Sequence, residues 1–513
     1  MYLCKLSKGI MKKETYFFSQ QILQPFLHSL KRFSQRNAFC INEQFYTYKQ
    51  FGVCVSNIRR QIQNTQIPDI VCLVANDTIE TYASIFALWL EGKSYVALHP
   101  KQPLERNESI IKQMDTAFIL DSNENSPYTH YKLLIPNALN NNSESFDYQV
   151  VSDDQLAYIL FTSGSTGVPK GVEISRKNLT AFVRAFEKTG IKITEQDRCL
   201  QCFDLTFDVS VQSFLLPLLK GACVYTVPHN QLKFKYVYEL LHQHKLTFGA
   251  MAPSMLRFLQ PYFNEVYLED FRCCILTAEA FSEEFVNQWS KSIPNAKIYN
   301  FYGPTEGTIY CTYYQFERTK ENKTLRGMLS IGKPLHGIEI VLIDEQNNEI
   351  LQGEKGELCI AGDQITTGYW NDAEKNEESF FYKTINRRKL RFYRTGDICF
   401  FADDGNILLQ GRKDYQVKIQ GYRIELGDIE YQAKLFLKDI HLVAFPFENA
   451  LKNTEIALVM ESKEFDTNTL KDYLQQKLPS YMIPTKYCFI AKFPINHNDK
   501  LDRTTLTKMI FPS

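Results

Sequence analysis

The sequence has no excess of charge of either sign, because 58 Lys and Arg residues balance 58 Asp and Glu residues. Proteins that bind nucleic acid through bulk charge carry an excess of Lys and Arg, so that class of function is excluded. No apolar run reaches the roughly 18 residues that a membrane span needs, and the N-terminus lacks an apolar stretch of signal-peptide length. The composition therefore predicts a cytoplasmic protein that binds neither nucleic acid nor a membrane.

The sequence also lacks the features of a disulfide framework, since its 13 Cys residues are odd in number and scattered along a long chain. One CxxC pair, Cys199 and Cys202, occurs in the apolar, strand-like run RCLQCF. A structural zinc site needs four ligands at suitable spacing, whereas a free Cys commonly packs as a small hydrophobe. We expect buried thiols at these two positions, with a zinc site as the less favoured alternative.

The order of the expected elements favours an α/β fold. Residues 84–100 are typical of an apolar helix, a glycine turn and a short strand, and residues 154–162 are typical of a buried strand. Strand, loop and helix keep alternating to about residue 310, and short strands with Gly and Asp turns predominate from 331 to 411. The sequence thus predicts a large N-terminal domain of layered α/β subdomains with a β-rich portion (1–412), a hinge (413–415) and a small, mobile C-terminal α+β domain (416–513).

The strongest local signal is TSGSTGVPKG, Thr162 to Gly171, which directly follows the predicted strand. Its glycines permit tight turns that aim backbone N–H groups inward, and its hydroxyls and Lys170 can contact anionic oxygens. The spacing differs from the P-loop pattern because Lys170 is followed by Gly171, so a P-loop NTPase is disfavoured. The segment predicts a polyphosphate site, with an ordinary flexible loop as the alternative.

Two further segments carry groups suited to a nucleotide. NFYGPTEGT, Asn300 to Thr308, offers Tyr302 as a stacking face for a base and Glu306 as an oxygen ligand for Mg²⁺. YRTGDI places Asp397 after a glycine in a turn, where its carboxylate can accept hydrogen bonds from a ribose diol. Taken alone, each segment is also typical of an ordinary turn.

Together these motifs resemble the adenylate-forming enzyme superfamily, which contains acyl-CoA synthetases, luciferases and amino-acid adenylation domains. The resemblance covers nearly the whole chain in the expected order, and it points to stand-alone amino-acid adenylation enzymes and D-alanine:carrier-protein ligases. It rests on LEGKSYVALHP, TSGSTGVPKG, FDVSVQSF, NFYGPTE, GELCIAG…GYWN, YRTGD, GRKDYQVKIQGYRIE and NHNDKLDR. So many motifs in one order make chance a poor explanation.

The segment FDVSVQSF bears on the branch of this superfamily. In amino-acid-activating members the Asp at this position, here Asp208, pairs with the α-ammonium of the substrate. A cation desolvated in a pocket needs an opposite charge, because burying it unpaired costs several kcal/mol. A fatty or aryl acid has no ammonium group, and the negative charge of Asp208 would repel its carboxylate. The alternative is a solvated or helix-capping Asp208, since Asp204 lies nearby and Ser210 could also cap.

The resemblance also implies the other binding positions. The bulky Phe301 and Tyr310 suggest a pocket of limited depth for a small or medium side chain, and Gln212 can supply a hydrogen bond. The amino-acid pocket is expected at Asp208, Val209, Gln212, Ala250, Leu276, Ala278, Phe301, Ile309, Tyr310 and Lys500. ATP is expected at Thr162, Ser163, Gly164, Thr166, Gly167, Lys170, Asn300, Phe301, Tyr302, Gly303, Thr305, Asp397, Arg412 and Lys500, and catalysis at Lys500, Glu306 and Thr305.

A reaction in two steps follows from the same resemblance. In the first, an amino-acid carboxylate attacks the α-phosphorus of ATP and expels pyrophosphate, with Lys500 bridging the reacting oxygens and Glu306 holding Mg²⁺. In the second, the C-terminal domain rotates about Asp414, and a phosphopantetheine thiol attacks the acyl carbon of the aminoacyl-AMP near residues 417–425, so that a thioester forms and AMP leaves. No carrier domain follows Lys500, so the carrier is expected to be a separate protein.

Two other functions remain open at this point. An acyl- or aryl-CoA ligase would use free CoA as the acceptor, and Asp208 argues against it. A non-catalytic homologue would bind nucleotide without turnover. Its one support is Asp499, which stands immediately before Lys500 where the family commonly has Gly, and which would bring negative charge near ATP.

Overall fold

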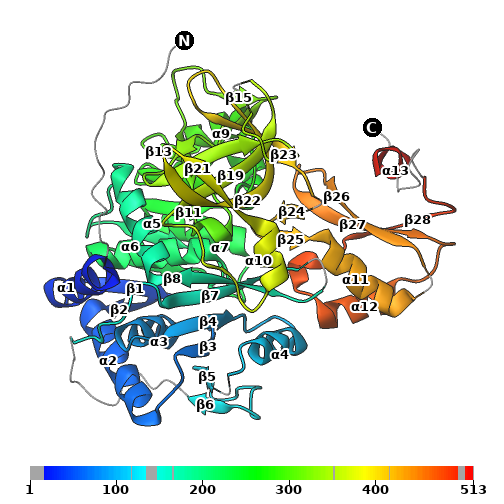
Figure 1. The fold of residues 1–513 in the computed structure, drawn as a ribbon. Coiled ribbons are helices and arrows are strands. Elements are labelled where there is room, and N and C mark those ends of the chain that lie inside the picture. The colour runs from blue at the N-terminus through cyan, green and yellow to red at the C-terminus, as the bar shows by residue number, and fades with distance from the viewer. Residues whose placement is uncertain are drawn as a thin grey trace.

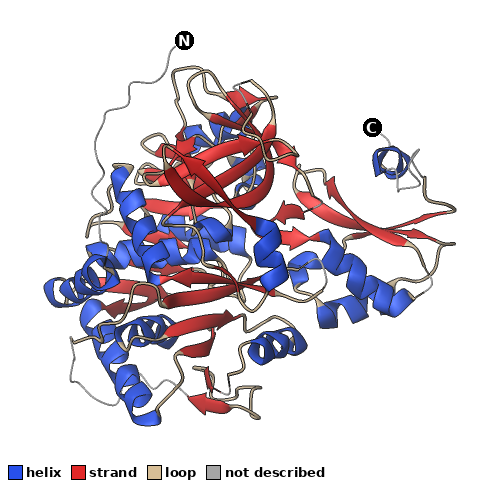
Figure 2. Ribbon diagram, viewed as in Figure 1, coloured by secondary structure: helices blue, strands red, loops and turns tan. Residues whose placement is uncertain are grey.

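The structure, a computed structural model, describes residues 17–116, 118–134, 147–164, 167–350, 353–414, 416–438, 440–494 and 503–511. Figure 1 shows a large body that carries most of the chain and, on one side of it, a smaller body formed by the orange and red C-terminal elements. Figure 2 shows strands in the interior of the large body and helices on the faces of its sheets. Two predicted site positions, Thr166 and Lys500, lie outside the described residues, and so does Asp499.

The first of two large sheets has nine strands, in the order β17-β14-β13-β12-β11-β9-β10-β1-β2. Its central strands pair in parallel, and β14, β17 and β2 pair antiparallel at the two edges. The strands are β17 (Lys333–Pro334), β14 (Thr312–Gln315), β13 (Lys297–Tyr302), β12 (Cys273–Thr277), β11 (Phe248–Met251), β9 (Arg198–Gln201), β10 (Cys223–Thr226), β1 (Asn37–Ile41) and β2 (Gln44–Thr47).

The second large sheet has seven strands, in the order β20-β8-β7-β4-β3-β5-β6. The strands from β7 to β6 pair in parallel, whereas β8 pairs antiparallel with β7 and with β20. They are β20 (Gly368–Tyr369), β8 (Lys170–Ser175), β7 (Leu156–Thr162), β4 (Ser94–Leu98), β3 (Ile70–Val74), β5 (Phe118–Leu120) and β6 (Lys132–Leu134). Buried residues dominate β7 and β4, as expected of strands that are covered on both faces.

The β-rich portion predicted for residues 331–411 is confirmed as an antiparallel sheet. It contains β18 (Ile338–Ile343), β19 (Gly356–Gly362), β22 (Arg388–Phe401), β21 (Phe380–Ile385) and β23 (Ile407–Arg412). A short ladder joins β15 (Thr324–Leu325) to β16 (Met328–Leu329).

The helices begin and end at recognisable signals. The Ser175 side chain accepts a hydrogen bond from the backbone N–H of Asn178 and caps α5, and Gly221 ends α6 in the left-handed region with φ 80°. In the large body lie α1 (Gln24–Arg32), α2 (Tyr48–Thr65), α3 (Ile79–Leu90), α4 (Leu104–Gln113), α5 (Arg176–Lys188), α6 (Asp208–Lys220), α7 (Lys233–Gln243), α8 (Pro253–Arg257), α9 (Glu283–Ser292) and α10 (Ala373–Ser379). A π-helical turn (Ser19–Leu23) precedes α1, and 3-10 turns occur at Gln260–Tyr262 and Thr305–Gly307.

The smaller body begins with a hairpin, β24 (Gln416–Ile419) and β25 (Tyr422–Glu425). A three-stranded sheet of β26 (Leu442–Glu448), β27 (Thr454–Glu461) and β28 (Lys486–Ile490) follows, with α11 (Leu426–Leu437), α12 (Asn468–Lys477), a 3-10 turn (Ser480–Met482) and α13 (Arg503–Ile510). Its main apolar cluster, from Ile419 to Met482, is separate from the large cluster that runs from Phe18 to Ile407. The predicted fold class is thereby confirmed.

The structure also bears on the two cysteines of the CxxC pair and on membrane-spanning helices. Cys199 and Cys202 are 1% and 3% exposed, and neither belongs to a cluster of possible metal ligands among the described residues, so they are buried thiols as expected. In the described part of the chain, no helix is both long enough and apolar enough to span a membrane.

Candidate active site

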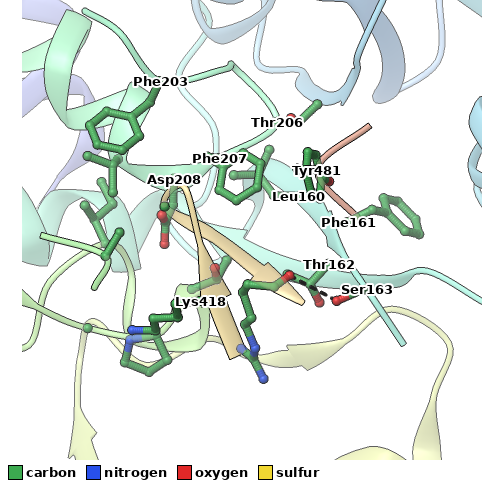
Figure 3. Close-up of a pocket in the computed structure, with 18 of the residues that line it drawn as sticks. Leu160, Phe161, Thr162, Ser163, Phe203, Thr206, Phe207, Asp208, Lys418 and Tyr481 are labelled. Carbon is green, nitrogen blue, oxygen red and sulfur yellow. Dashed lines mark hydrogen bonds between the residues drawn. The ribbon is translucent and has the colours of Figure 1, made fainter. Parts of the chain in front are cut away.

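The candidate site is a pocket between the large body and the C-terminal hairpin. Thr162 and Ser163 reach it from the end of β7, and Asp208 reaches it from the first turn of α6. Lys418 of the hairpin closes another side, and Figure 3 shows these four side chains around one cavity. Parallel strands present their carboxyl ends at one edge of a sheet, which is where ligands bind in open α/β folds.

Thr162 is the last residue of β7 and pairs with Lys170, the first residue of β8, and the described residues Ser163, Gly164 and Gly167 of the TSGSTG segment lie between these two strands in the sequence. Gly164 is required here, because a Cβ at this position would lie 2.1 Å from the carbonyl oxygen of Val168. Burial lowers the pKa of Lys170, and the neighbouring Lys375 lowers it further. Of the predicted phosphate-side residues, Thr162 and Ser163 line the pocket, whereas Gly164, Gly167 and Lys170 do not.

The hairpin occupies the Ser163 side of this loop. The Ser163 hydroxyl donates a hydrogen bond to the carbonyl oxygen of Arg423 at 3.1 Å and accepts one from the N–H of Glu425 at 3.1 Å. One of these hydrogen bonds is drawn as a dashed line in Figure 3. The first hydroxyl of the predicted phosphate site is therefore bound to main-chain groups of β25.

Glu306 is fully buried and already has its oxygens engaged. Nη1 of Arg423 lies 2.9 and 2.8 Å from its two carboxylate oxygens, and the Tyr369 hydroxyl donates to Oε1 at 2.5 Å. Burial raises the pKa of Glu306, but the Arg423 charge and these hydrogen bonds outweigh it and leave the pKa below its usual value. In this arrangement Glu306 does not fit Mg²⁺, because a guanidinium group stands where a cation would bind.

Asp397 and Arg412 are brought together as a cross-strand pair of β22 and β23, and both line the pocket. Arg412 Nη1 lies 3.0 Å from Asp397 Oδ1, and Arg412 also binds the Asp414 carboxylate at 2.6 and 2.7 Å. The Tyr302 hydroxyl donates to Asp397 from the end of β13. Burial and the Asp397 charge raise the pKa of Tyr302 well above its usual value.

Asp208 is 8% exposed, and no ion pair to it occurs among the described residues. Burial raises its pKa to about 6, although hydrogen bonds from the Val209 N–H and the Thr305 side chain favour the charged form. Lys418 stands on the hairpin side of the same pocket, where burial lowers its own pKa. No described residue forms an ion pair with Asp208, and burial in the pocket outweighs the hydrogen bonds and the Lys418 charge that favour its charged form.

The other predicted positions fall into two groups. Gly303, Thr305, Val209, Ala278 and Ile309 line the pocket. Behind its wall lie Gln212, Ala250, Leu276, Phe301 and Tyr310, which are at most 1% exposed, and Asn300, whose side chain donates to the Ser330 carbonyl oxygen at 2.8 Å.

Sequence reasoning missed a charged cluster beside the pocket. Asp204 lies 3.3 Å from the Lys233 ammonium, 3.7 Å from His99 Nε2 and 3.6 Å from His229 Nδ1, and it accepts a hydrogen bond from the Tyr422 hydroxyl of the hairpin. Burial raises the pKa of Asp204, but the Lys233 charge and the His99 contact hold it well below its usual value. The one local signal was the first Asp in FDLTFD, which is Asp204 itself.

These features agree with the comparisons to known proteins. A family model described as AMP-binding enzyme matches residues 26–370. The chain therefore belongs to the family of AMP-binding enzymes, and the resemblance stated from its motifs is confirmed. The D-alanine--D-alanyl carrier protein ligase of Lactococcus lactis subsp. lactis (strain IL1403) is 31% identical over 489 residues, which cover 91% of this chain and 94% of that protein.

Peptide synthases show a similar likeness over part of their length. Tyrocidine synthase 1 of Brevibacillus parabrevis is 29% identical over an alignment that covers 96% of this chain and 45% of that protein. Gramicidin S synthase 2 of Brevibacillus brevis is 28% identical over an alignment that covers 97% of this chain and 11% of that protein. The chain thus spans less than half of these curated relatives. Among solved structures, a similar one is the Vibrio cholerae adenylation domain AlmE in complex with glycyl-adenosine-5'-phosphate. The TM-score is 0.84 at 21% sequence identity, and the alignment covers 98% of this chain and 100% of that chain. This likeness shows a shared fold.

Proposed function

We propose that this chain activates an amino acid with ATP as an aminoacyl-AMP, releases pyrophosphate, and then transfers the aminoacyl group to the phosphopantetheine thiol of a carrier protein. The family supplies the AMP-forming chemistry. The names of the relatives, which include a D-alanyl carrier protein ligase and peptide synthases, support an amino-acid substrate and a carrier.

The observation that carries the proposal is the buried carboxylate of Asp208 at the pocket wall, to which no described residue forms an ion pair. An α-ammonium group beside it would stabilise its charged form and would itself be stabilised in return. A substrate without an amine would leave the carboxylate uncompensated and would add a second negative charge. The pocket thus favours amino acids over fatty or aryl acids.

ATP would lie with its phosphates at Thr162 and Ser163 and its ribose at Asp397 and Arg412, all of which line the pocket. The phosphates can reach the Ser163 hydroxyl only after the hairpin has left it. Lys500 would then join the substrate carboxylate to the α-phosphate. Glu306 would not hold Mg²⁺ in this arrangement, because Arg423 neutralises its carboxylate.

The arrangement with the hairpin in the pocket suits the second step. The hairpin lines the site with Gln416, Lys418, Gly421 and Arg423. Asp414, bound to Arg412 just before the hairpin, is our proposed hinge between domains 1–412 and 416–513. Rotation there would exchange the hairpin for Lys500 between the two steps.

The first test is ATP–pyrophosphate exchange with amino acids and with matched acids that lack an amine, on wild type and Asp208→Asn. We expect exchange with an amino acid, and a fall in kcat/KM of about 100-fold or more in the variant, as for loss of one partner of a buried ion pair. Asp466→Asn, a change at an exposed site of the C-terminal part, is the control. Exchange only with amine-free acids would assign the chain to the acyl- or aryl-CoA ligases instead.

A second test separates the two steps. Lys500→Ala should abolish exchange but spare transfer from a preformed aminoacyl-AMP to a phosphopantetheine thiol. Asp414→Pro, which restricts the backbone at the proposed hinge, should do the reverse. Equal losses in both steps for both variants would contradict the rotation.

A further inference from the structure

A cluster of metal-ligating side chains lies outside the candidate pocket, at the turn that joins β1 to β2. Its members are Cys40, Glu43 and His244, and one ligand atom from each lies within 4.8 Å of the other two. None of the three lines the pocket, and no step of the proposed function uses them. A thiol, a carboxylate and an imidazole are the donors that zinc takes in proteins, whereas Mg²⁺ prefers oxygen alone.

The β1–β2 turn brings Cys40 and Glu43 together. Asn42 and Glu43 form the turn, with φ of 50° and 62°. Ile41 pairs with Gln44 across it. Two ligands separated by two residues on a tight turn have the spacing that zinc sites commonly use for their cysteines. The turn can therefore bind one metal ion through both side chains.

The third ligand comes from a distant segment of the chain. His244 follows the last residue of α7, and its Nε2 lies 2.9 Å from Oε2 of Glu43. The rings of Phe45 and Tyr225 pack against the imidazole, with centroids 6.1 and 5.1 Å away, and hold its orientation. Nδ1 has no hydrogen-bonding partner among the described residues, so it can carry the proton while Nε2 binds a metal ion.

The surroundings of the cluster suit a bound cation. The Tyr236 hydroxyl donates to Oε1 of Glu43 at 3.0 Å, as second partners of metal-ligating carboxylates commonly do. Cys40 is 2% exposed but the Glu43 side chain is 56% exposed, so a metal ion can enter from solvent and keep a water ligand. Burial and the Glu43 charge raise the pKa of the Cys40 thiol to about 12. A divalent cation between the two groups would compensate both.

A second cluster of this kind, formed by His99, Asp204 and His229, does not meet the same conditions. Nδ1 of His99 accepts a hydrogen bond from the Lys101 N–H at 3.1 Å, so the proton of the neutral ring is on Nε2, the atom that faces Asp204. The Lys233 ammonium lies 3.3 Å from Asp204 and already supplies positive charge there. Of the two clusters found in the described part of the chain, the one at the β1–β2 turn is therefore the candidate for a metal.

We propose that the β1–β2 turn and the end of α7 bind one zinc ion, through Sγ of Cys40, a carboxylate oxygen of Glu43, Nε2 of His244 and a water molecule. Ligand atoms around a tetrahedral zinc ion lie about 3.2 to 3.8 Å apart, so shifts of about 1 Å complete the site. The zinc–sulfur bond replaces the bond from sulfur to its proton, which is released to solvent. The ion ties the edge of the nine-stranded sheet to α7 and thereby stabilises the folded chain.

Cobalt(II) is the probe in the first experiment, because a thiolate bound to it gives a charge-transfer band in the near ultraviolet. The metal is added to the purified, chelator-treated full chain. We expect an equimolar amount to give that band, zinc to remove it by displacing cobalt, and Cys40→Ser to lack it. Cys54→Ser is the matched control, because Cys54 is also 2% exposed and belongs to neither cluster.

His244→Gln keeps the proposal testable if Cys40→Ser does not fold, because the His244 side chain is partly exposed and lies at the end of its helix. We expect zinc affinity to fall about 100-fold or more in this variant, and about 10-fold in Tyr236→Phe. Zinc should also raise the midpoint of thermal unfolding of the wild-type chain, but not that of His244→Gln.

Several outcomes would overturn the proposal. One is the absence of a charge-transfer band from the folded wild-type chain. A band that survives in Cys40→Ser, or that disappears in Cys54→Ser, would place the metal at another thiol. Equal zinc affinity in the wild-type chain and His244→Gln would exclude the imidazole as a ligand. Because none of these measurements depends on ATP–pyrophosphate exchange, their failure leaves the proposed function standing.

Discussion

Replacing Asp208 with Asn is expected to stabilise the protein at neutral pH while it removes amino-acid activation. The folded state raises the pKa of Asp208 from 3.8 to about 6, chiefly by burial. Between these two values the folded protein holds a proton that the unfolded chain has lost, so stability falls as pH rises from about 4 to about 6. The rise of about two pKa units corresponds to about 3 kcal/mol in the free energy of unfolding, at about 1.4 kcal/mol per unit. The wild-type protein has lost all of this stability once the pH is above 6.

Asn keeps the shape of the side chain and cannot ionise. The variant should therefore match wild type below pH 4 and exceed it by about 3 kcal/mol in free energy of unfolding at pH 7 to 8. Urea unfolding across this pH range, without ligand, measures the difference. Trp89 and Trp289 are both 0% exposed in the large apolar cluster, and their fluorescence reports its loss.

Asp204→Asn provides a control of opposite sign, four residues before Asp208 in the segment that leads into α6. The charge of Lys233 and the contact with His99 hold the pKa of Asp204 well below its usual value despite burial. Its contribution to stability is present above the unfolded pKa and is lost as pH falls through the folded one. Asp204→Asn should thus destabilise at neutral pH. If the Asp208→Asn difference is flat with pH, or if both variants destabilise at pH 8, the electrostatic reasoning is wrong.

Two further predictions concern the hairpin and the pocket loop. Arg423→Gln leaves the buried Glu306 without its cation, so the variant should weaken hairpin docking by about 3 kcal/mol. The measurement is backbone hydrogen exchange, which should become faster over residues 416–425. An unchanged rate of hydrogen exchange there would contradict the prediction. Gly303→Ala places a Cβ 2.6 Å from the Ile309 carbonyl oxygen, so the loop that carries Gly303 has to shift. ATP–pyrophosphate exchange should therefore fall at least about 10-fold, while the circular-dichroism spectrum stays unchanged. Exchange activity equal to that of wild type would show that the loop adapts.

Much of the fold follows from local patterns. The apolar run at 154–162 predicts a buried strand, and β7 occupies Leu156–Thr162. The short strands expected within 331–411 appear as β18, β19 and β23. The pocket could be anticipated because Thr162 and Asp208 stand where a strand ends and a helix begins, and such ends meet at one edge of a sheet.

The contacts that pair distant segments could not be predicted in the same way. Arg423 binds Glu306 across 117 positions, and Tyr422 binds Asp204 across 218. Neither periodicity nor spacing carries information on which of several exposed cations docks on a buried carboxylate.

The hydrogen bonds between Ser163 and the hairpin have a consequence for how tightly the protein holds nucleotide. A triphosphate that takes the Ser163 hydroxyl has to displace Arg423 and Glu425 first, so the apparent dissociation constant for ATP is the intrinsic one divided by the undocked fraction. If docking is favoured by about 3 kcal/mol, only about one molecule in 150 is ready to bind at any moment. Weak nucleotide binding at equilibrium would then report the resting position of the C-terminal segment and not a poor fit between ATP and its site.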